Sequence, residues 1–278
     1  MDTTQQSKLA PKTSGVGSES GHWYNADGLV KSVPLASGKG MTTRITAAHA
    51  RKFGLVPSVT GILKIIDKPN LTAWKCKEYV RAAGFVGAMG KDEQFDDYFK
   101  RVAEQFDRYN DHAAVGTDIH AQIAKWLEGE KYDAIVDKAI AWLFDMQQEL
   151  CAKYGAENVL VESEKPFASA LGFGGTVDWK FITPKEVVFI DFKSTDDDKL
   201  GLGDRLAYKD SHLAQLVAYD MGTNINADSA ERKYYNVFTG RLGGGIHVKQ
   251  WTDAGEIDWA RAYFKAALNL FKIVKGLN

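Results

Sequence analysis

The fold is decided by the stretch from Gly172 to Thr195, GFGGTVDWKFITPKEVVFIDFKST, which predicts two β-strands joined by a tight turn. Apolar and polar residues alternate on both sides of the turn, as is typical of strands. One predicted face of the hairpin is apolar and the other carries charge. The apolar set is Val177, Trp179, Phe181, Val188, Ile190 and Phe192, and the opposite set is Thr176, Asp178, Lys180, Phe189, Asp191 and Lys193.

A turn centred between Pro184 and Lys185 places Asp178 opposite Asp191. Directly opposed side chains lie about 4.5–5.5 Å apart at Cβ, and like charges in that position destabilise a sheet. A hard divalent cation such as Mg²⁺, held through carboxylates, would remove the repulsion. Lys193 follows Asp191 by two residues and projects from the same face of the strand. The alternative interpretation is an ordinary strand face exposed to solvent.

The composition indicates a globular protein without a global basic field. The chain has 278 residues, of which 45% are hydrophobic and 12% aromatic, enough for a sizeable core. Its formal net charge is −1, which does not favour non-specific coating of nucleic acid. A nucleic-acid site in this chain would therefore be a local basic groove.

The cysteine usage and the termini predict a cytoplasmic protein in a reducing compartment. Cys76 and Cys151 lie far apart and lack a CxxC pattern, which argues against a zinc site or a disulfide framework. Residues 1–20 are polar and predict a flexible tail without a secretory signal. The sequence contains no apolar stretch of membrane-spanning length, so no membrane partner is expected.

Periodicity predicts a chain in which helices precede and follow the hairpin. Pro57 and Ser58 are a helix start, and a second helix near Leu71 carries Lys75 and Arg81, which either line a phosphate groove or face solvent. Short strands are expected within 22–46 and a loop after Thr195. Further helices are expected at 91–110, 115–127, 135–150, 212–219 and 255–275, and strands at 158–167, 233–238 and 246–251.

Five polar residues outside the hairpin are candidates for a site. His120 lies just off the apolar stripe of its helix, where a structural histidine is the alternative. Glu162 and Glu164 share a strand face by their spacing of two, so either can add a carboxylate to the two aspartates, or both lie at a solvent-exposed edge. Gln215 and Tyr219 are spaced i, i+4 on one helix face.

The order of these residues resembles the RecB-like branch of the PD-(D/E)XK nuclease superfamily. The motifs of that branch run GTxxH, E, GxxD, DxK and QLxxY. Here they match Gly116-Thr117…His120, a strand Glu, Gly175…Asp178, Asp191-Phe192-Lys193 and Gln215…Tyr219. Pro57-Ser58-Val59-Thr60…Ile62-Leu63 and Leu71…Trp74 look like elements of the phage and mitochondrial genome-maintenance exonucleases within that branch.

The resemblance covers roughly residues 55 to 220 and departs from the family in two places. Val177 stands where the superfamily name has Pro. Glu164, followed by Lys165-Pro166-Phe167, is closer to the family spacing than Glu162, which is the alternative.

The resemblance implies an α/β fold with a restriction-endonuclease-like core, a central mixed β-sheet flanked by helices and an added N-terminal helical region. Residues 21–278 would form one nuclease domain. Within it, the resemblance implies a helical insertion at about 60–155, a catalytic core at about 110–252 and a C-terminal helix at about 255–275.

The resemblance also implies a site for Mg²⁺ or Mn²⁺. Asp178, Asp191 and the backbone carbonyl of Phe192 would hold the ion, and His120 would complete its shell or bind a second ion. Glu164 would position the metal or the attacking water. Lys193 would orient the water or stabilise the developing charge. Gln215 and Tyr219 would contact the DNA backbone or brace Lys193. Thr117, Lys75 and Arg81 would bind DNA.

The implied function is that of a metal-dependent DNA exonuclease acting on DNA ends in recombination, repair or phage genome processing. A structure-specific endonuclease, similar to a junction resolvase, is an alternative within enzymes. A catalytically silent DNA-binding protein is a third, which the complete set of Asp178, Asp191 and Lys193 disfavours. The implied partners are linear DNA, single- or double-stranded, and a recombination or single-strand-binding protein in a bacterial or phage-infected cell.

Overall fold

The computed structural model describes residues 22–35, 39–66, 69–109, 112–223, 230–243 and 245–277. Only the backbone is described for residues 69–71, 108, 109 and 112–118. The predicted flexible tail, residues 1–20, lies outside the described residues.

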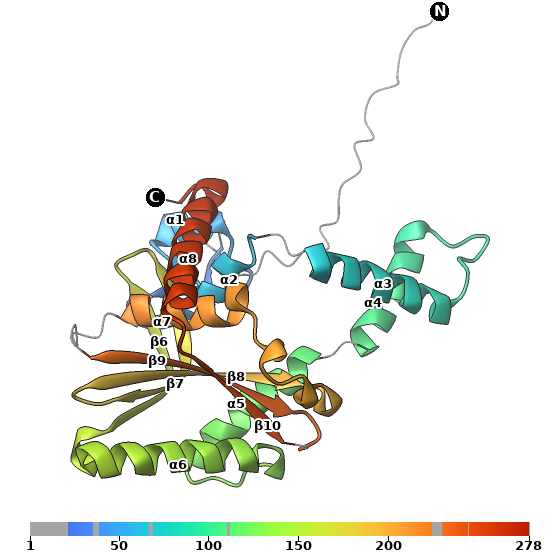
Figure 1. Cartoon of the computed structure of the whole chain (residues 1–278). Coiled ribbons are helices and arrows are strands. Elements are labelled where there is room, and N and C mark those ends of the chain that lie inside the picture. The colour runs from blue at the N-terminus through green and yellow to red at the C-terminus, as the bar shows by residue number, and fades with distance from the viewer. Residues whose placement is uncertain are drawn as a thin grey trace, which may run out of the picture.

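The centre of the fold is a mixed five-stranded sheet with helices on both faces (Figure 1). Its strand order is β10-β9-β8-β7-β6. β8 and β9 are parallel, and every other neighbouring pair is antiparallel. The strands are β6 (Leu160–Ser169), β7 (Phe173–Ile182), β8 (Glu186–Thr195), β9 (Glu231–Gly240) and β10 (Ile246–Trp251).

The parallel pair requires the chain to cross one face of the sheet between β8 and β9. The crossover contains a 3-10 segment, η3 (Asp197–Leu206), a π-helical turn, η4 (Lys209–Leu213), and the helix α7 (Ala214–Thr223). The sequence predicted a loop after Thr195, and η3 occupies that loop. The crossover brings the helix that carries Gln215 onto the face of β8.

Two hydrophobic cores cover the two faces of the sheet. One core lies beneath α7, α8 (Ala254–Lys275) and α2 (Val59–Leu63), and includes Phe189, Leu216 and Phe264. The other lies beneath α5 (His112–Leu127) and α6 (Asp137–Tyr154), and includes Ile190 and Leu143. Nearly all of β7 and β8 is buried as a result. The predicted apolar face is confirmed for Trp179, Phe181, Val188, Ile190 and Phe192, which share the core beneath α5 and α6. The opposite face carries Asp191 and Lys193 as predicted, but α7 covers it, so it is not a strand face open to solvent.

The side-chain alternation of β7 shifts by one residue at Asp178. Val177 belongs to the core beneath α7 and α8, whereas Trp179 belongs to the core beneath α5 and α6. In a regular strand these two residues would point to the same face. The prediction that Val177 and Trp179 share a face was therefore wrong, and the irregularity lies at the candidate site.

The N-terminal region adds small elements beside the main sheet. β1 (Trp23–Asn25), β2 (Gly28–Val30) and β5 (Val56–Pro57) form a three-stranded sheet, and β3 (Val33–Pro34) pairs with β4 (Met41–Thr42). Short strands in this region were predicted and are confirmed, whereas α1 (Ala47–Phe53) was not predicted. Ser58 caps α2, because its hydroxyl accepts a hydrogen bond from the Gly61 N–H at 3.0 Å.

Two long helices, α3 (Pro69–Val86) and α4 (Phe95–Tyr109), stand apart from the main sheet and pack against each other (Figure 1). The rings of Tyr79 and Phe106 stack between them with centroids 4.3 Å apart. The short 3-10 turns η1 (Ala134–Val136) and η2 (Ala156–Asn158) flank α6. Within the described ranges, no helix combines the length and the apolar character needed to cross a membrane.

Replacing Gly222 with Ala should destabilise the protein, because aromatic rings pack closely against α7 at this glycine. A Cβ at Gly222 would lie 2.2 Å from the ring of Phe167 and 2.7 Å from that of Phe173. We expect the free energy of unfolding to fall by about 1–3 kcal/mol in urea denaturation. Gly84→Ala is the matched control, because that helical position is exposed with nothing within 4 Å of its Cβ. It should be stabilising by about 0.5–1 kcal/mol, and equal effects at the two glycines would contradict this packing.

Candidate metal centre

The register of the β7–β8 hairpin brings Asp178 and Asp191 to neighbouring positions. The ladder between the two strands pairs Ile182 with Val187 and continues to Trp179, opposite Ile190. This register is the predicted one, and Asp178 and Asp191 come next in it. The described ladder ends before that pair, so the strands separate where the two carboxylates stand.

A third carboxylate lies in the same row across the sheet. β6 pairs with β7 on both sides of Glu164, but the described ladder skips the position where Glu164 would face Asp178. Glu164 has a φ of 47°, and it is the sole non-glycine residue with positive φ among the described residues. Such a backbone is strained for a residue with a side chain. Glu164, Asp178 and Asp191 therefore follow one another on β6, β7 and β8.

His120 reaches this row from α5. Ile119 and Ile123 bury one side of α5 in the core beneath it. The Nδ1 atom of His120 lies 3.2 Å from Oε1 of Glu164 and 3.6 Å from Oδ2 of Asp178. One ligand atom from each of these three residues lies within 4.8 Å of the other two. We call His120, Glu164 and Asp178 the metal triad.

The metal triad fits a hard divalent cation. Two ligands of one Mg²⁺, with bonds of about 2.0–2.1 Å, lie at most roughly 4 Å apart. Both separations from His120 satisfy this limit. Carboxylate oxygens suit Mg²⁺ and Mn²⁺, and a single imidazole is also a common ligand of transition metals.

The electrostatics of the metal triad also favour a cation. Burial lowers the pKa of His120, but the carboxylates of Asp178 and Glu164 outweigh it and raise this pKa to about 9. Burial raises the pKa of Asp178 to about 7, against the opposing effect of His120 and with a further increase from Asp191. In the absence of a metal, protons on His120 and Asp178 therefore neutralise part of the negative charge of the carboxylates. A bound cation would take the place of these protons.

Asp178 also binds the backbone beyond the end of the ladder. Its Oδ2 accepts a hydrogen bond from the N–H of Phe192 at 2.9 Å. Phe192 thus contacts the metal triad through its backbone N–H. Ligation of a metal by its backbone carbonyl stays a prediction.

Asp191 lies outside the metal triad. Its carboxylate is fully buried, with Oδ1 accepting from Lys193 Nζ at 2.7 Å and Oδ2 from Asn236 Nδ2 at 2.8 Å. The sequence predicted that Asp178 and Asp191 converge on one ion, but the structure gathers Glu164 and His120 around Asp178 instead. The shifted alternation of β7 explains the difference, because it turns Asp178 towards α5. Each carboxylate oxygen keeps a further lone pair, so ligation by Asp191 stays a prediction.

Lys193 is held between β8 and α7. Its ammonium donates to Asp191 and, at 3.1 Å, to Oε1 of Gln215, whose Nε2 donates to the Tyr219 hydroxyl at 2.7 Å. Burial lowers the pKa of Lys193, but Asp191 and Asp178 outweigh it and raise the pKa above its usual value. Lys193 is therefore a cation.

Gln215 and Tyr219 serve as a brace rather than as a surface. Their exposed fractions are 8% and 4%. The sequence left two roles open, contact with the DNA backbone or bracing of Lys193. Their burial and their hydrogen bonds match the bracing role, and contact of these two side chains with DNA stays a prediction.

Two further residues of the network, Asn236 and Trp251, were not predicted. Asn236 on β9 is fully buried beside Asp191 in the parallel ladder, and its Oδ1 accepts from the indole N–H of Trp251 on β10 at 2.8 Å. A signal existed, because Asn236 is a lone amide in the apolar run of the strand at 233–238, and a buried amide needs partners.

Two of the other predicted DNA-binding residues, Lys75 and Arg81, lie away from the metal triad. Lys75 and Arg81 are on α3, which stands apart from the main sheet (Figure 1). Arg81 pairs with Glu78 at 2.8 Å. The side chain of Thr117 lies outside the described residues.

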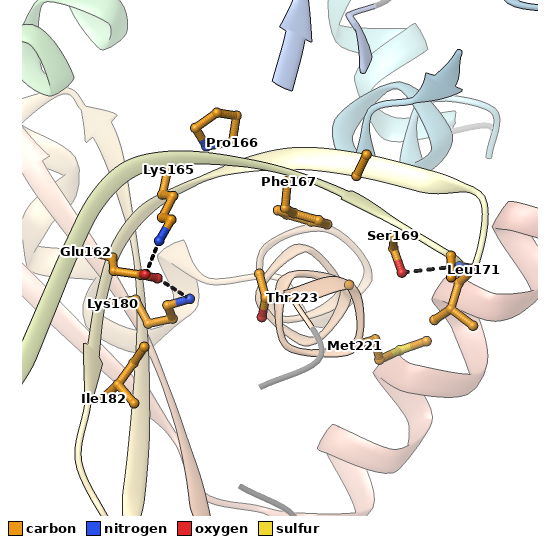
Figure 2. A pocket seen from close by; sticks show the side chains of 13 residues that line it. Glu162, Lys165, Pro166, Phe167, Ser169, Leu171, Lys180, Ile182, Met221 and Thr223 are labelled. Atoms are coloured by element: carbon orange, nitrogen blue, oxygen red, sulfur yellow. Dashed lines mark hydrogen bonds and ion pairs between the residues drawn. The ribbon is translucent and has the colours of Figure 1, made fainter. Parts of the chain in front are cut away.

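Glu162 does not share the surroundings of Glu164. Figure 2 shows its carboxylate between Lys180, 2.5 Å away, and Lys165. Lys180 faces the core beneath α7, since its ammonium lies over the ring of Phe189. The prediction that Glu162 and Glu164 share a face was wrong. The left-handed backbone at Glu164 directs its side chain towards His120, whereas the side chain of Glu162 lies beside Lys180. Glu164 is the residue that meets Asp178.

A cavity of about 550 Å³ lies beside Glu162, between the β6–β7 hairpin and the end of α7 (Figure 2). Phe167 and Met221 form part of its apolar lining. The residues that line it include none of the metal triad, Asp191 or Lys193. Its charged groups are paired with one another, so we place the candidate chemistry at the metal triad rather than in this cavity.

The chain matches no protein-family model and no curated protein. A functional assignment therefore depends on the residues and distances above.

Metal binding should depend on Glu164 and not on Glu162. We expect Mn²⁺ to bind the protein in titration calorimetry, with affinity reduced at least tenfold by Glu164→Gln or His120→Ala, because each change removes one member of the metal triad. Glu162→Gln is the matched control and should bind Mn²⁺ as the unchanged protein does. A stronger effect of Glu162→Gln than of Glu164→Gln would overturn this assignment, provided that thermal melts show both variants folded.

Asn236→Leu should cost stability because it leaves two buried groups without a partner. These are the Asp191 carboxylate oxygen and the indole N–H of Trp251. An unsatisfied buried group costs about 1–3 kcal/mol and a charged one more, so we expect a loss of about 3 kcal/mol in urea denaturation. Asn269→Leu on the exposed side of α8 should change stability by no more than about 0.5 kcal/mol. Similar losses in both variants would contradict the network.

Proposed function

We propose that the protein is a metal-dependent DNA exonuclease of the PD-(D/E)XK type, in the RecB-like branch, which hydrolyses phosphodiester bonds at DNA ends. The observation that carries the proposal is the row of Glu164, Asp178 and Asp191 on three adjacent strands. His120 adjoins one end of the row and Lys193 the other. Carboxylates and an imidazole can hold a metal ion, and an ammonium can stabilise developing negative charge, so this set of groups suits metal-assisted phosphodiester hydrolysis.

The fold supports the proposal in a coarser way. A mixed sheet with helices on both faces is compatible with the restriction-endonuclease-like core that the motifs imply. The five motifs come from α5, β6, β7, β8 and α7, and these elements meet around one interruption in the sheet.

The chemistry divides between a metal ion and the chain. A Mg²⁺ or Mn²⁺ ion bound at this place supplies a lowered pKa for water and polarisation of the phosphoryl oxygen. The metal triad and Asp191 would hold the ion.

Lys193 would stabilise the negative charge that develops on the phosphate. It is suited to this role because it is cationic and partly exposed, with 27% of its side chain accessible. Preorganised charges aimed at a developing negative charge lower the barrier because they need no reorganisation during the reaction. Gln215 and Asn236 provide the preorganisation, since Gln215 holds Lys193 and Asn236 holds Asp191.

The raised pKa of Lys193 supports a charge-stabilising role over that of a general base. A general base must release its proton near the working pH. The two aspartates favour the protonated form of Lys193, and the water would be activated at the metal instead.

The experiment compares three DNA substrates with and without metal. End-labelled linear single strands, linear duplexes and closed circles are incubated with the protein in Mg²⁺, in Mn²⁺ or with a chelator. We expect metal-dependent loss of linear DNA with the circles intact. Asp191→Asn and Lys193→Met should each lower the rate by at least about 10²-fold.

Asp258→Asn is the control, because this carboxylate is 77% exposed on α8, and the variant should retain full activity. Nicking of closed circles would favour the structure-specific endonuclease. Absence of cleavage in both metals, with the protein folded, would leave a DNA-binding protein as the alternative.

A further inference from the structure

The cavity beside Glu162 is charged at one end and apolar at the other. It occupies about 550 Å³ between the β6–β7 hairpin and the end of α7, which lies within the range of roughly 300–1,000 Å³ for small-molecule sites. Figure 2 shows Glu162, Lys165 and Lys180 gathered at one end of the cavity, and Leu171 and Met221 at the other. A ligand that fits this lining has a charged head and an apolar body.

The charged end of the cavity carries more positive than negative charge. Nζ of Lys180 lies 2.5 Å from Oε2 of Glu162, and the ammonium of Lys165 donates to Oε1 of the same carboxylate. Two ammonium groups therefore share one carboxylate. An anionic head would balance the remaining positive charge, whereas a cationic head would add to it.

The ammonium of Lys180 has donors left for a ligand. Its side chain is 5% exposed, and an ammonium carries three N–H donors. Within the part of the chain that the structure describes, this ammonium meets one carboxylate, that of Glu162, and lies 5.9 Å from the centre of the Phe189 ring. Buried donors are normally hydrogen-bonded, so the oxygens of a bound head group would complete the set of acceptors.

The rest of the cavity offers an apolar surface with one fixed and one adaptable side. The ring of Phe167 is held edge-to-face against the rings of Phe173 and Tyr219, with both centroids 6.1 Å away. Met221 has a flexible thioether that adapts its shape to a neighbour. Leu171 is 51% exposed and would lose contact with water when an apolar chain covers it.

We propose that this cavity binds a small amphipathic anion, with a carboxylate or phosphate-monoester head at Lys180 and Lys165 and an unbranched apolar chain that extends towards Met221. Both head groups present the same chemistry, which is negative charge on oxygens that accept from an ammonium. The site is separate from the metal triad, and the proposal does not depend on the nuclease function.

The test is titration calorimetry with decanoate and with decyl phosphate, in a chelator so that no metal ion can hold the head group. We expect both anions to bind one site, and decanol and decylamine to bind at least about tenfold more weakly, because charge-assisted hydrogen bonds are lost. Affinity should rise roughly fourfold per methylene from hexanoate to octanoate. It should stop rising once the chain fills the cavity.

Two substitutions at the charged end should act in opposite directions. Lys180→Met removes the buried ammonium and should weaken decanoate binding by at least about tenfold. Glu162→Gln removes the negative charge beside the head group and should strengthen it. Lys185→Met is the matched control, because this lysine is exposed in the β7–β8 turn and does not line the cavity, and it should bind decanoate as the unchanged protein does.

Three results would overturn the proposal. They are absence of decanoate binding by the folded protein, binding of decanol as tight as that of decanoate, and unchanged affinity in folded Lys180→Met. Met221→Trp narrows the apolar end without touching an ion pair, so it tests the site should Lys180→Met fail to fold. This variant should lose affinity for decanoate, and unchanged affinity would likewise reject the cavity as the site.

Discussion

The structure depends on the burial of one negative charge, the carboxylate of Asp191. A buried carboxylate is costly unless it is paired and hydrogen-bonded. Lys193 supplies the charge, and Asn236 supplies a hydrogen bond that is itself fixed by Trp251. These partners come from β8, β9 and β10, so the three strands must adopt their observed order for the charge to be tolerated. Stability and the candidate chemistry therefore share the same hydrogen bonds.

The sequence predicted the local part of this arrangement well. The alternation in the hairpin and the position of its turn define the register, and the register alone brings Asp178 beside Asp191. Helix starts such as Ser58 were predictable because a capping side chain acts within a few residues. The motif order also pointed to His120, Glu164 and Gln215 before any distance was known.

The remaining features depend on contacts between distant segments, which periodicity does not encode. The side-chain alternation of β7 shifts at Asp178 because Val177 packs in the core on one face of the sheet and Trp179 in the core on the other. The alternating sequence pattern does not reveal this shift. Glu162 and Glu164 look equivalent because they are two residues apart. The left-handed backbone of Glu164 nevertheless turns their side chains to different faces of the strand. Asn236 follows Asp191 by 45 residues and meets it through the parallel pairing of β8 and β9.

The π-helical turn η4 makes one short segment common to two parts of the molecule. It contains Lys209 and His212, and it runs without a break into the helix that carries Gln215. Inserted turns of this kind are frequent at functional sites. Gln215 is the second residue of that helix and accepts a hydrogen bond from Lys193. The Lys193 ammonium is thus positioned from the crossover as well as from the sheet.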